Sequence, residues 1–163
     1  MITSNAIRLA VAADAAAIAL MSRHLIEHGL PWGWDGQRVA QAILAPHINV
    51  AVTGPRGAPV GFGIMAYHDD DAHLVLFAVQ PARQRQGLGK ALLDWLEAAA
   101  RVAGAERIRV EARRENLAAR IFYNELGYHE RTISKAMYNG QVDGVRLEKW
   151  LRVHDVSASG AAS

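Results

Sequence analysis

Four stretches of the chain carry apolar residues at the spacing of an amphipathic helix. The clearest covers residues 88–102, where apolar side chains recur every three to four positions and Gly104 stands just beyond. Asp14 and Asn116 are of the residue type that caps helix N-termini, and each precedes such a stretch. The pattern therefore predicts helices over residues 14–28, 37–45, 88–103 and 116–126.

Shorter runs rich in β-branched and aromatic residues lie between turn residues and predict strands. These seven runs cover residues 6–11, 47–54, 59–68, 73–81, 107–112, 128–138 and 144–153. The resulting order is β-α-α-β-β-β-α-β-α-β-β, which favours an α/β fold with a mixed sheet and helices on both faces. No repeat or linker interrupts it, so we predict one domain over residues 1–155 and a disordered tail over residues 156–163.

Composition narrows the class of protein. The 163 residues are 51% hydrophobic and 21% charged, as in ordinary globular proteins, and include no cysteine. Disulfide frameworks, thiol catalysis and cysteine-bound zinc are therefore excluded. The N-terminus lacks the pattern of a signal peptide, and no apolar run approaches the ~18 residues of a membrane span. We expect a soluble, cytoplasmic protein with no membrane partner.

Charge is concentrated in one part of the chain. The net charge of +2 is too small to indicate a nucleic-acid partner. Residues 81–120, however, hold nine of the 18 Lys and Arg residues but only five of the 16 Asp and Glu residues. This local surplus favours an anionic ligand, although arginine-rich helix faces exposed to water would give the same count.

Two clusters resemble metal sites only in composition. His24 and His28 lie one helical turn apart, and three aspartates occupy residues 69–71. The histidines have no evident third ligand, and three consecutive side chains in a turn converge poorly on one ion. We therefore predict no metal site.

The stretch "RQRQGLGK", residues 83–90, joins a predicted strand to a predicted helix. It is neither a dinucleotide fingerprint, because Leu92 replaces the third glycine, nor a Walker A loop, because Ala91 follows the lysine. The first amides of a helix have no intrahelical partner and attract anions, and glycines let a phosphate approach. The alternative is a glycine-rich turn whose amides bind water.

Two motifs in this order resemble those of a known family. Gln84-x-x-Gly87-x-Gly89 resembles the Gln/Arg-x-x-Gly-x-Gly/Ala motif of the GNAT superfamily of acetyl-CoA-dependent N-acetyltransferases. A second block resembles the family pattern E-x-R-x-x-N-x-x-A-x-x-x-Y-x-x-x-G-F/Y. Its matching residues are Glu111, Arg113, Asn116, Ala119, Tyr123, Gly127 and Tyr128.

Within the superfamily, the spacing of the second block and Pro31-Trp32 are similar to the branch that acetylates ribosomal-protein N-termini. The same spacing also recurs among enzymes that acetylate small molecules. The resemblance therefore leaves two classes of amine acceptor open, protein N-termini and small-molecule amines.

The resemblance implies a fold and a cofactor position. The sheet would be mostly antiparallel with about seven strands, splayed between the fourth and fifth, and acetyl-CoA would lie in that opening. Its pantetheine arm would pair with the backbone of Phe77, Ala78 and Val79 and contact Asn116. The pyrophosphate would bind the backbone amides of Arg85, Gln86, Gly87, Leu88, Gly89 and Lys90.

The resemblance also implies catalytic residues. The amine would attack acetyl-CoA directly in a ternary complex, and a lysine-type amine, with a pKa of ~10.4, arrives protonated. Glu111 matches the position of the base, which would act through a water molecule, and Tyr123 matches that of the acid that protonates the departing thiolate. A backbone N–H near Val79 would hold the oxyanion. The alternatives are that Glu111 pairs with Arg109 or Arg113, and that Tyr123 only packs its helix onto the sheet.

Other aspects of function are less constrained by the motifs. Trp32 and Trp34 lie in a loop that borders the acceptor site in this superfamily, but tryptophans beside glycines also serve as core anchors. The competing function is a non-catalytic sensor that binds acyl-CoA. The apolar last strand is a candidate for pairing across a homodimer.

Overall fold

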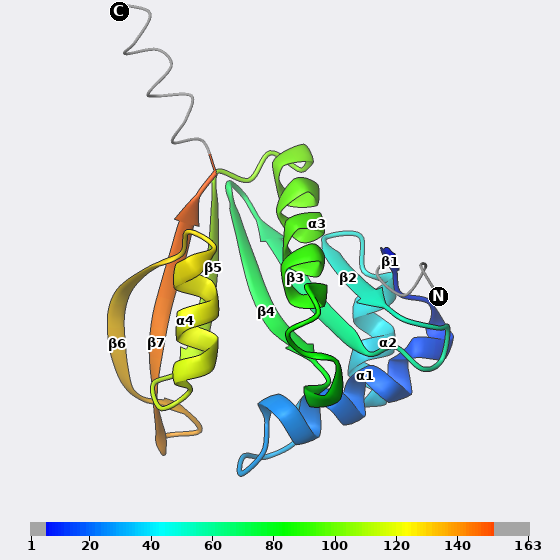
Figure 1. The fold of residues 1–163 in the computed structure, drawn as a ribbon, viewed down its shortest axis with the longest axis horizontal. Helices are drawn as coiled ribbons and strands as arrows, with labels where there is room; N and C mark the ends of the chain where they lie inside the picture. The colour runs from blue at the N-terminus through cyan, green and yellow to red at the C-terminus, as the bar shows by residue number, and fades with distance from the viewer. Residues whose placement is uncertain (1–5, 152–163) are drawn as a thin grey trace, which may run out of the picture. The chain divides into compact units, whose positions relative to one another are not determined.

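The computed structural model describes residues 6–151, and the elements follow the predicted order (Figure 1). The strands are β1 (Ile7–Leu9), β2 (Ile48–Thr53), β3 (Gly61–His68), β4 (Asp71–Val79), β5 (Arg107–Arg113), β6 (His129–Tyr138) and β7 (Val142–Trp150). The α-helices are α1 (Ala15–Met21), α2 (Gly36–Leu44), α3 (Leu88–Val102) and α4 (Leu117–Glu125). Among residues 6–151, no helix has the length and apolar character needed to cross a membrane. The tail predicted over residues 156–163 lies outside the described residues.

The strands form a seven-stranded mixed sheet in the order β1-β2-β3-β4-β5-β7-β6. The β1–β2, β2–β3, β5–β7 and β6–β7 pairs are antiparallel. The starts of β4 and β5 run in the same direction. Asp71 contacts Arg107, and further along both strands His73 contacts Glu111. The predicted mixed, mostly antiparallel sheet of about seven strands is thus confirmed.

The described chain divides into two compact units. The first contains residues 6–66 and Leu74–Ala98, and the second contains Tyr67–His73 and residues 99–151. The boundary passes through β3, β4 and α3. The glycine loop and both tryptophans belong to the first unit, whereas Glu111, Asn116 and Tyr123 belong to the second.

Helices cover both faces of the strands in the first unit, as predicted (Figure 1). Alternate residues of a strand point to opposite faces of a sheet. Phe62 and Ile64 of β3 belong to the buried cluster that includes residues of α1 and α2. Gly63, which lies between them, faces Leu96 of α3 so closely that a larger side chain would collide with it.

The prediction for the first helix was wrong in two respects. Instead of one continuous helix from Asp14 to about His28, a short 3-10 turn, η2 (Ala12–Asp14), precedes α1, and a π-helical turn, η3 (Ser22–Ile26), follows it. The Asp14 carboxylate also does not cap α1. It is fully buried and accepts hydrogen bonds from Arg8 and from the backbone N–H groups of Val11 and Gly57.

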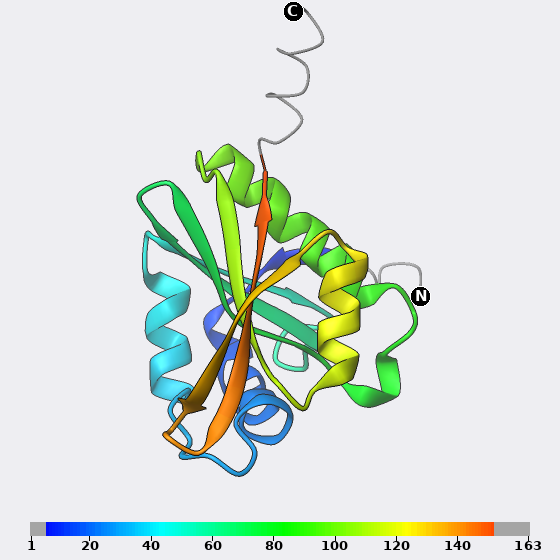
Figure 2. The same ribbon diagram turned by 90° about the vertical axis from the view of Figure 1, so that its left-hand side faces the viewer.

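The second unit is built on the antiparallel β5–β7–β6 ladder, with α4 (yellow in Figure 2) beside β6. In β5, Ile108, Val110 and Ala112 are buried and alternate with partly exposed polar residues. The prediction that the last strand pairs across a homodimer was wrong for β7. Its residues 144–148 already pair with β5 on one side and β6 on the other, so its backbone has no free edge there.

Candidate active site

Glu111 lies on the polar face of β5 and contacts β4. Its carboxylate Oε1 is 2.6 Å from Nε2 of His73, at the start of β4. The hydrogen-bond partner of Glu111 is thus a histidine, and Arg109 acts on the carboxylate only through its charge. Burial opposes ionisation of Glu111, but the bond to His73 and the nearby positive charges outweigh it and lower the pKa of the carboxyl group. Glu111 is therefore a carboxylate at neutral pH.

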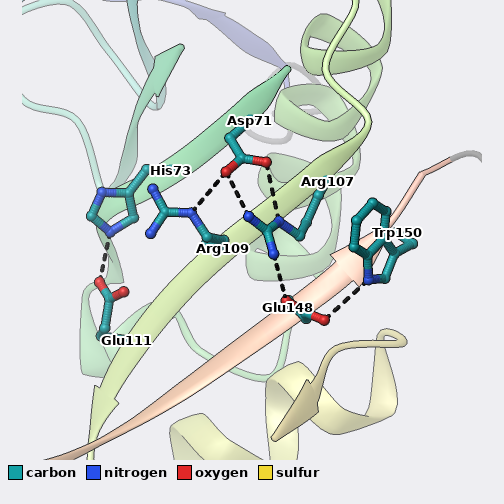
Figure 3. Close-up of polar contacts among 7 residues, drawn as sticks. All are labelled: Asp71, His73, Arg107, Arg109, Glu111, Glu148 and Trp150. Atoms are coloured by element: carbon teal, nitrogen blue, oxygen red, sulfur yellow. Dashed lines mark hydrogen bonds and ion pairs between the residues drawn. The ribbon is translucent and has the colours of Figure 1, made fainter. Parts of the chain in front are cut away.

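A network of ion pairs fixes the start of β4 beside β5 and β7 (Figure 3). The guanidinium of Arg107 binds both carboxylate oxygens of Asp71, at 3.1 and 2.7 Å, and also Glu148 of β7 at 3.1 Å. Arg109 pairs with Asp71 at 3.4 Å. Because Asp71 is two residues before His73, the same clamp holds the imidazole beside Glu111.

The charge of Glu111 contributes to the pKa values of two tyrosines, Tyr123 and Tyr138. Tyr123 of α4 is buried, and its ring packs edge-to-face against Phe122 and Tyr128 at centroid distances of 5.3 and 5.6 Å. Burial raises the pKa of Tyr123, with further contributions from Tyr138 and from the Glu111 charge. Burial and then the Glu111 charge raise the pKa of Tyr138, at the end of β6, to about 12. Both phenols thus stay protonated at neutral pH and can donate a proton or a hydrogen bond.

The glycine loop adopts an unusual backbone conformation before α3. Arg85 and Gly87 both have left-handed φ angles, +62° and +82°. A non-glycine residue such as Arg85 adopts this conformation at a cost, and such outliers cluster at ligand-binding sites. Backbone N–H groups near left-handed residues and at a helix start form concave anion sites. The loop is thus suited to a phosphate-bearing ligand.

Side chains of the loop have distinct roles. Gln84 donates its amide N–H to the backbone carbonyl of Val79 at 2.9 Å, which ties the loop to the end of β4. Leu88 is buried, so only its backbone can face a ligand. Lys90 is largely exposed and pairs with Asp94 at 2.7 Å. Gln86 accepts a hydrogen bond from Arg83 at 3.1 Å.

Asn116 caps α4, as the sequence predicts. Its side-chain oxygen accepts the N–H of Ala119 at 3.1 Å, the usual bond of an N-cap residue. Glu111, Asn116 and Tyr123 lie in one compact unit, whereas Phe77, Ala78, Val79 and residues 85–90 lie in the other.

The two tryptophans occupy different environments in the first unit. Trp34 packs against the buried cluster of α1, α2, β2 and β3, and the guanidinium of Arg38 stacks 3.9 Å from its ring centroid. Trp32 is 39% exposed, and its indole N–H donates to the carbonyl of Ala19 at 3.3 Å. Glu27 accepts the backbone N–H groups of Gly33 and Trp34 and so holds the loop in place. Trp34 thus anchors the loop, and Trp32 presents its ring at the surface.

Sequence reasoning missed His73 and Tyr138. His73 is an isolated histidine at the start of an apolar strand, and its partner lies 38 positions away. The signal that would have found it is alternation on two parallel strands, which puts Asp71 and His73 on the face shared by Arg107, Arg109 and Glu111. That signal requires the register of the pair, which the sequence does not contain.

Comparison with known sequences decides the family. The sequence model of the acetyltransferase (GNAT) family matches residues 11–128. The chain belongs to the GNAT acetyltransferase family. Its relatives include the [ribosomal protein bS18]-alanine N-acetyltransferase of Escherichia coli K12, 31% identical over 75% of this chain and 84% of that enzyme. The enzyme of the same name from Haemophilus ducreyi is 34% identical over 68% of this chain and 74% of that enzyme.

Solved structures agree on the fold. The crystal structure of the ribosomal-protein-S18-alanine N-acetyltransferase from Escherichia coli matches this GNAT chain with a TM-score of 0.74 and 28% identity, covering 89% of this chain and 92% of that one. The structure of yncA from Salmonella typhimurium with its cofactor acetyl-CoA gives a TM-score of 0.75 at 23% identity, with the same coverage, and bears on the fold alone.

The family and the named relatives establish the coarse activity. This GNAT chain is an acetyl-CoA-dependent N-acetyltransferase, with acetyl-CoA as co-substrate and an amine as acceptor. A non-catalytic sensor, the competing prediction, is therefore not supported.

Proposed function

We propose that this chain acetylates the α-amine of alanine at a protein N-terminus. The observation that carries the proposal is the similarity, at 31–34% identity over at least 68% of the chain, to enzymes named for that acceptor. The chemistry is compatible with it. An α-amine has a pKa of about 7.7–8.0, so it is deprotonated near neutral pH far more easily than a lysine amine.

We propose that the first unit holds the cofactor. The backbone amides of residues 85–90 would bind the pyrophosphate, and the backbone of Phe77, Ala78 and Val79 would pair with the pantetheine arm. The left-handed Arg85 and Gly87, together with the start of α3, support this assignment. Trp32, with its exposed ring, would contact the acceptor, and Trp34 would support it from the core.

We propose that the second unit provides the proton transfers of a direct attack in a ternary complex. Deprotonation of the acceptor amine would depend on Glu111, the carboxylate beside His73. Tyr123, a protonated phenol, would protonate the thiolate, and Asn116 would contact the pantetheine arm. Since the family match of residues 11–128 spans both units, we propose that they act as one catalytic domain, as predicted over residues 1–155.

Release of free thiol from acetyl-CoA tests the acceptor. The full chain is incubated with acetyl-CoA and a peptide that begins with alanine. The matched controls are the same peptide blocked at its N-terminus, the blocked peptide with one internal lysine, and a polyamine. We expect thiol release, and a mass increase of one acetyl group, only with the free alanine N-terminus. Faster turnover of the polyamine or of the lysine side chain would overturn the proposal in favour of another amine.

A further inference from the structure

The hydrogen bond between His73 and Glu111 assigns a role to a residue that neither the motifs nor the comparisons identify. Building on the acetyltransfer proposed above, we propose that the imidazole of His73 takes the proton removed from the acceptor amine, and that Glu111 acts through it as a positioning residue. The 2.6 Å contact between Nε2 and Oε1 carries the proposal.

The geometry of the pair is that of a carboxylate that orients an imidazole. A carboxylate can only accept, so Nε2 of His73 must carry the hydrogen of this bond, and the lone pair of neutral His73 is then on Nδ1. The ion pairs of Asp71 with Arg107 and Arg109 fix the strand two residues away (Figure 3). Both side chains remain partly exposed, 31% for His73 and 21% for Glu111, so a proton can leave to solvent.

The proton balance favours the imidazole. The lowered pKa of Glu111 makes this carboxylate a poor proton acceptor at neutral pH, whereas histidine is the side chain that most often serves as a general base. The ammonium gives its first proton to Nδ1, and the freed lone pair forms the C–N bond while the C–S bond breaks. Tyr123 gives its proton to the thiolate. The second proton then leaves the same nitrogen and restores the phenol of Tyr123. The imidazolium then releases its proton to water.

Charged and titratable groups of β4, β5, β6, β7 and α4 interact electrostatically with Glu111. Arg109 of β5 and Arg146 of β7, the cross-strand neighbour of Glu111, bring positive charge. Tyr123 of α4 and Tyr138 of β6 bring phenols that stay neutral near pH 7. Asp71 of β4 is neutralised by its two arginines. Arg109 and Arg146 favour the ionised carboxylate of Glu111.

The test compares His73→Gln with Glu111→Gln. Glutamine at residue 73 retains an N–H that can donate to Glu111 but has no group that titrates. We expect His73→Gln to lower kcat by about 100-fold or more and to remove the acidic limb of the kcat–pH profile. Glu111→Gln should lower kcat but keep an acidic limb. Saturating concentrations of both substrates are used, so that ionisation of the free amine does not enter the profile.

The outcomes separate the assignments. The proposal is overturned if His73→Gln keeps the wild-type kcat and limb. If Glu111→Gln also removes the limb, Glu111 is the base and acts without His73. His129→Gln, which changes an exposed histidine of β6, is the matched control and should leave kcat and the limb unchanged. The measurement uses whichever amine the thiol-release assay identifies, so a wrong acceptor would overturn the proposed substrate without affecting this test.

Discussion

Among single residues, Tyr123 gives the most specific kinetic prediction, because its proposed role depends on the phenol hydroxyl alone. If it protonates the thiolate, Tyr123→Phe should lower kcat about 100-fold and leave the affinity for acetyl-CoA within about twofold, because only the hydroxyl group is lost. Steady-state kinetics and calorimetric titration with acetyl-CoA measure the two quantities.

Tyr128 provides the control for this substitution. Its ring is buried and packs edge-to-face against Tyr123, and the family pattern accepts phenylalanine at this position. Tyr128→Phe should therefore retain kcat. An unchanged kcat in Tyr123→Phe would remove the acid role and leave this tyrosine as a packing residue.

Asp14 is a buried carboxyl group that makes the stability of the fold depend on pH. Its burial opposes ionisation, but bonds from Arg8, Val11 and Gly57 lower its pKa from 3.8 to about 2. A carboxyl group with a lowered folded-state pKa stabilises the protein above pH 3.8 and loses this contribution as the pH falls toward 2. Asp14→Asn should thus cost about 2 kcal/mol at pH 7 and progressively less below pH 4. Urea unfolding at several pH values measures this difference, and a constant difference between pH 7 and 2 would contradict it.

At this scale, local rules predicted some contacts and missed others. Asn116 caps α4 because capping needs only the next three residues. Asp14 also precedes a helix, but its carboxylate oxygens accept hydrogen bonds from Arg8 and Gly57, which lie in two other segments. His73 meets Glu111 only through the register of two strands. The family motif identified Glu111, but it did not identify His73 as its hydrogen-bond partner.

Among the elements, the loop before α3 depends most on backbone conformation. No atom lies within 4 Å of the place that a Cβ of residue 87 would take, so a larger side chain would meet no steric clash there. The φ angle of Gly87 is +82°, however, and a residue with a Cβ would be strained in this conformation. Gly87→Val should distort the loop amides and weaken acetyl-CoA binding at least tenfold, as measured by calorimetry.

Gly104 offers a matched substitution in the other unit. It has a φ of +90° and the same open surroundings, just after α3. Gly104→Val should introduce a similar backbone strain while leaving acetyl-CoA affinity unchanged. Equal losses of affinity in both variants would indicate a general effect on the fold and not a binding role of the loop.

The helices and strands themselves were largely predictable, and the exceptions have physical causes. The predicted strand ends differ from the observed ones by a few residues, as expected where strands fray. The predicted first helix divides because the ladder of hydrogen bonds widens at Ser22, whose hydroxyl binds Glu27, and Glu27 in turn holds Gly33 and Trp34. No periodicity of apolar residues reports such a side-chain network.

For the whole molecule, thermal unfolding should distinguish variants that lose cofactor binding from variants that lose only catalysis. A ligand at 100 times its Kd stabilises a protein by about 2.7 kcal/mol, which raises the Tm of a chain of this size by roughly 5–10 °C. Acetyl-CoA at the same concentration should produce this shift in the wild type and in Tyr123→Phe, but about half of it or less in Gly87→Val. The absence of any shift in the wild type would contradict the cofactor-binding assignment.

Sequence patterns predicted the fold class but not the division of the chain. Motifs at residues 84–89 and 111–128 imply the sheet and its cofactor, and the family match supports both. The boundary between the two units passes inside β3, β4 and α3, where no glycine-rich or charged linker marks it. Compactness is a property of long-range contacts, and a linear pattern does not report it.

The outer strand of the second unit has a consequence for handling the protein at high concentration. β6 is the last strand in the sheet order, and its pairing with β7 twice shifts register. Ala136 has a left-handed φ of +54°, and the side chains of Arg131 and Lys135 are exposed. Kinked, charged edges of this kind are poor templates for a strand of another molecule. Purified protein should therefore resist fibrillar aggregation through this edge, and substitutions that straighten it would remove that protection.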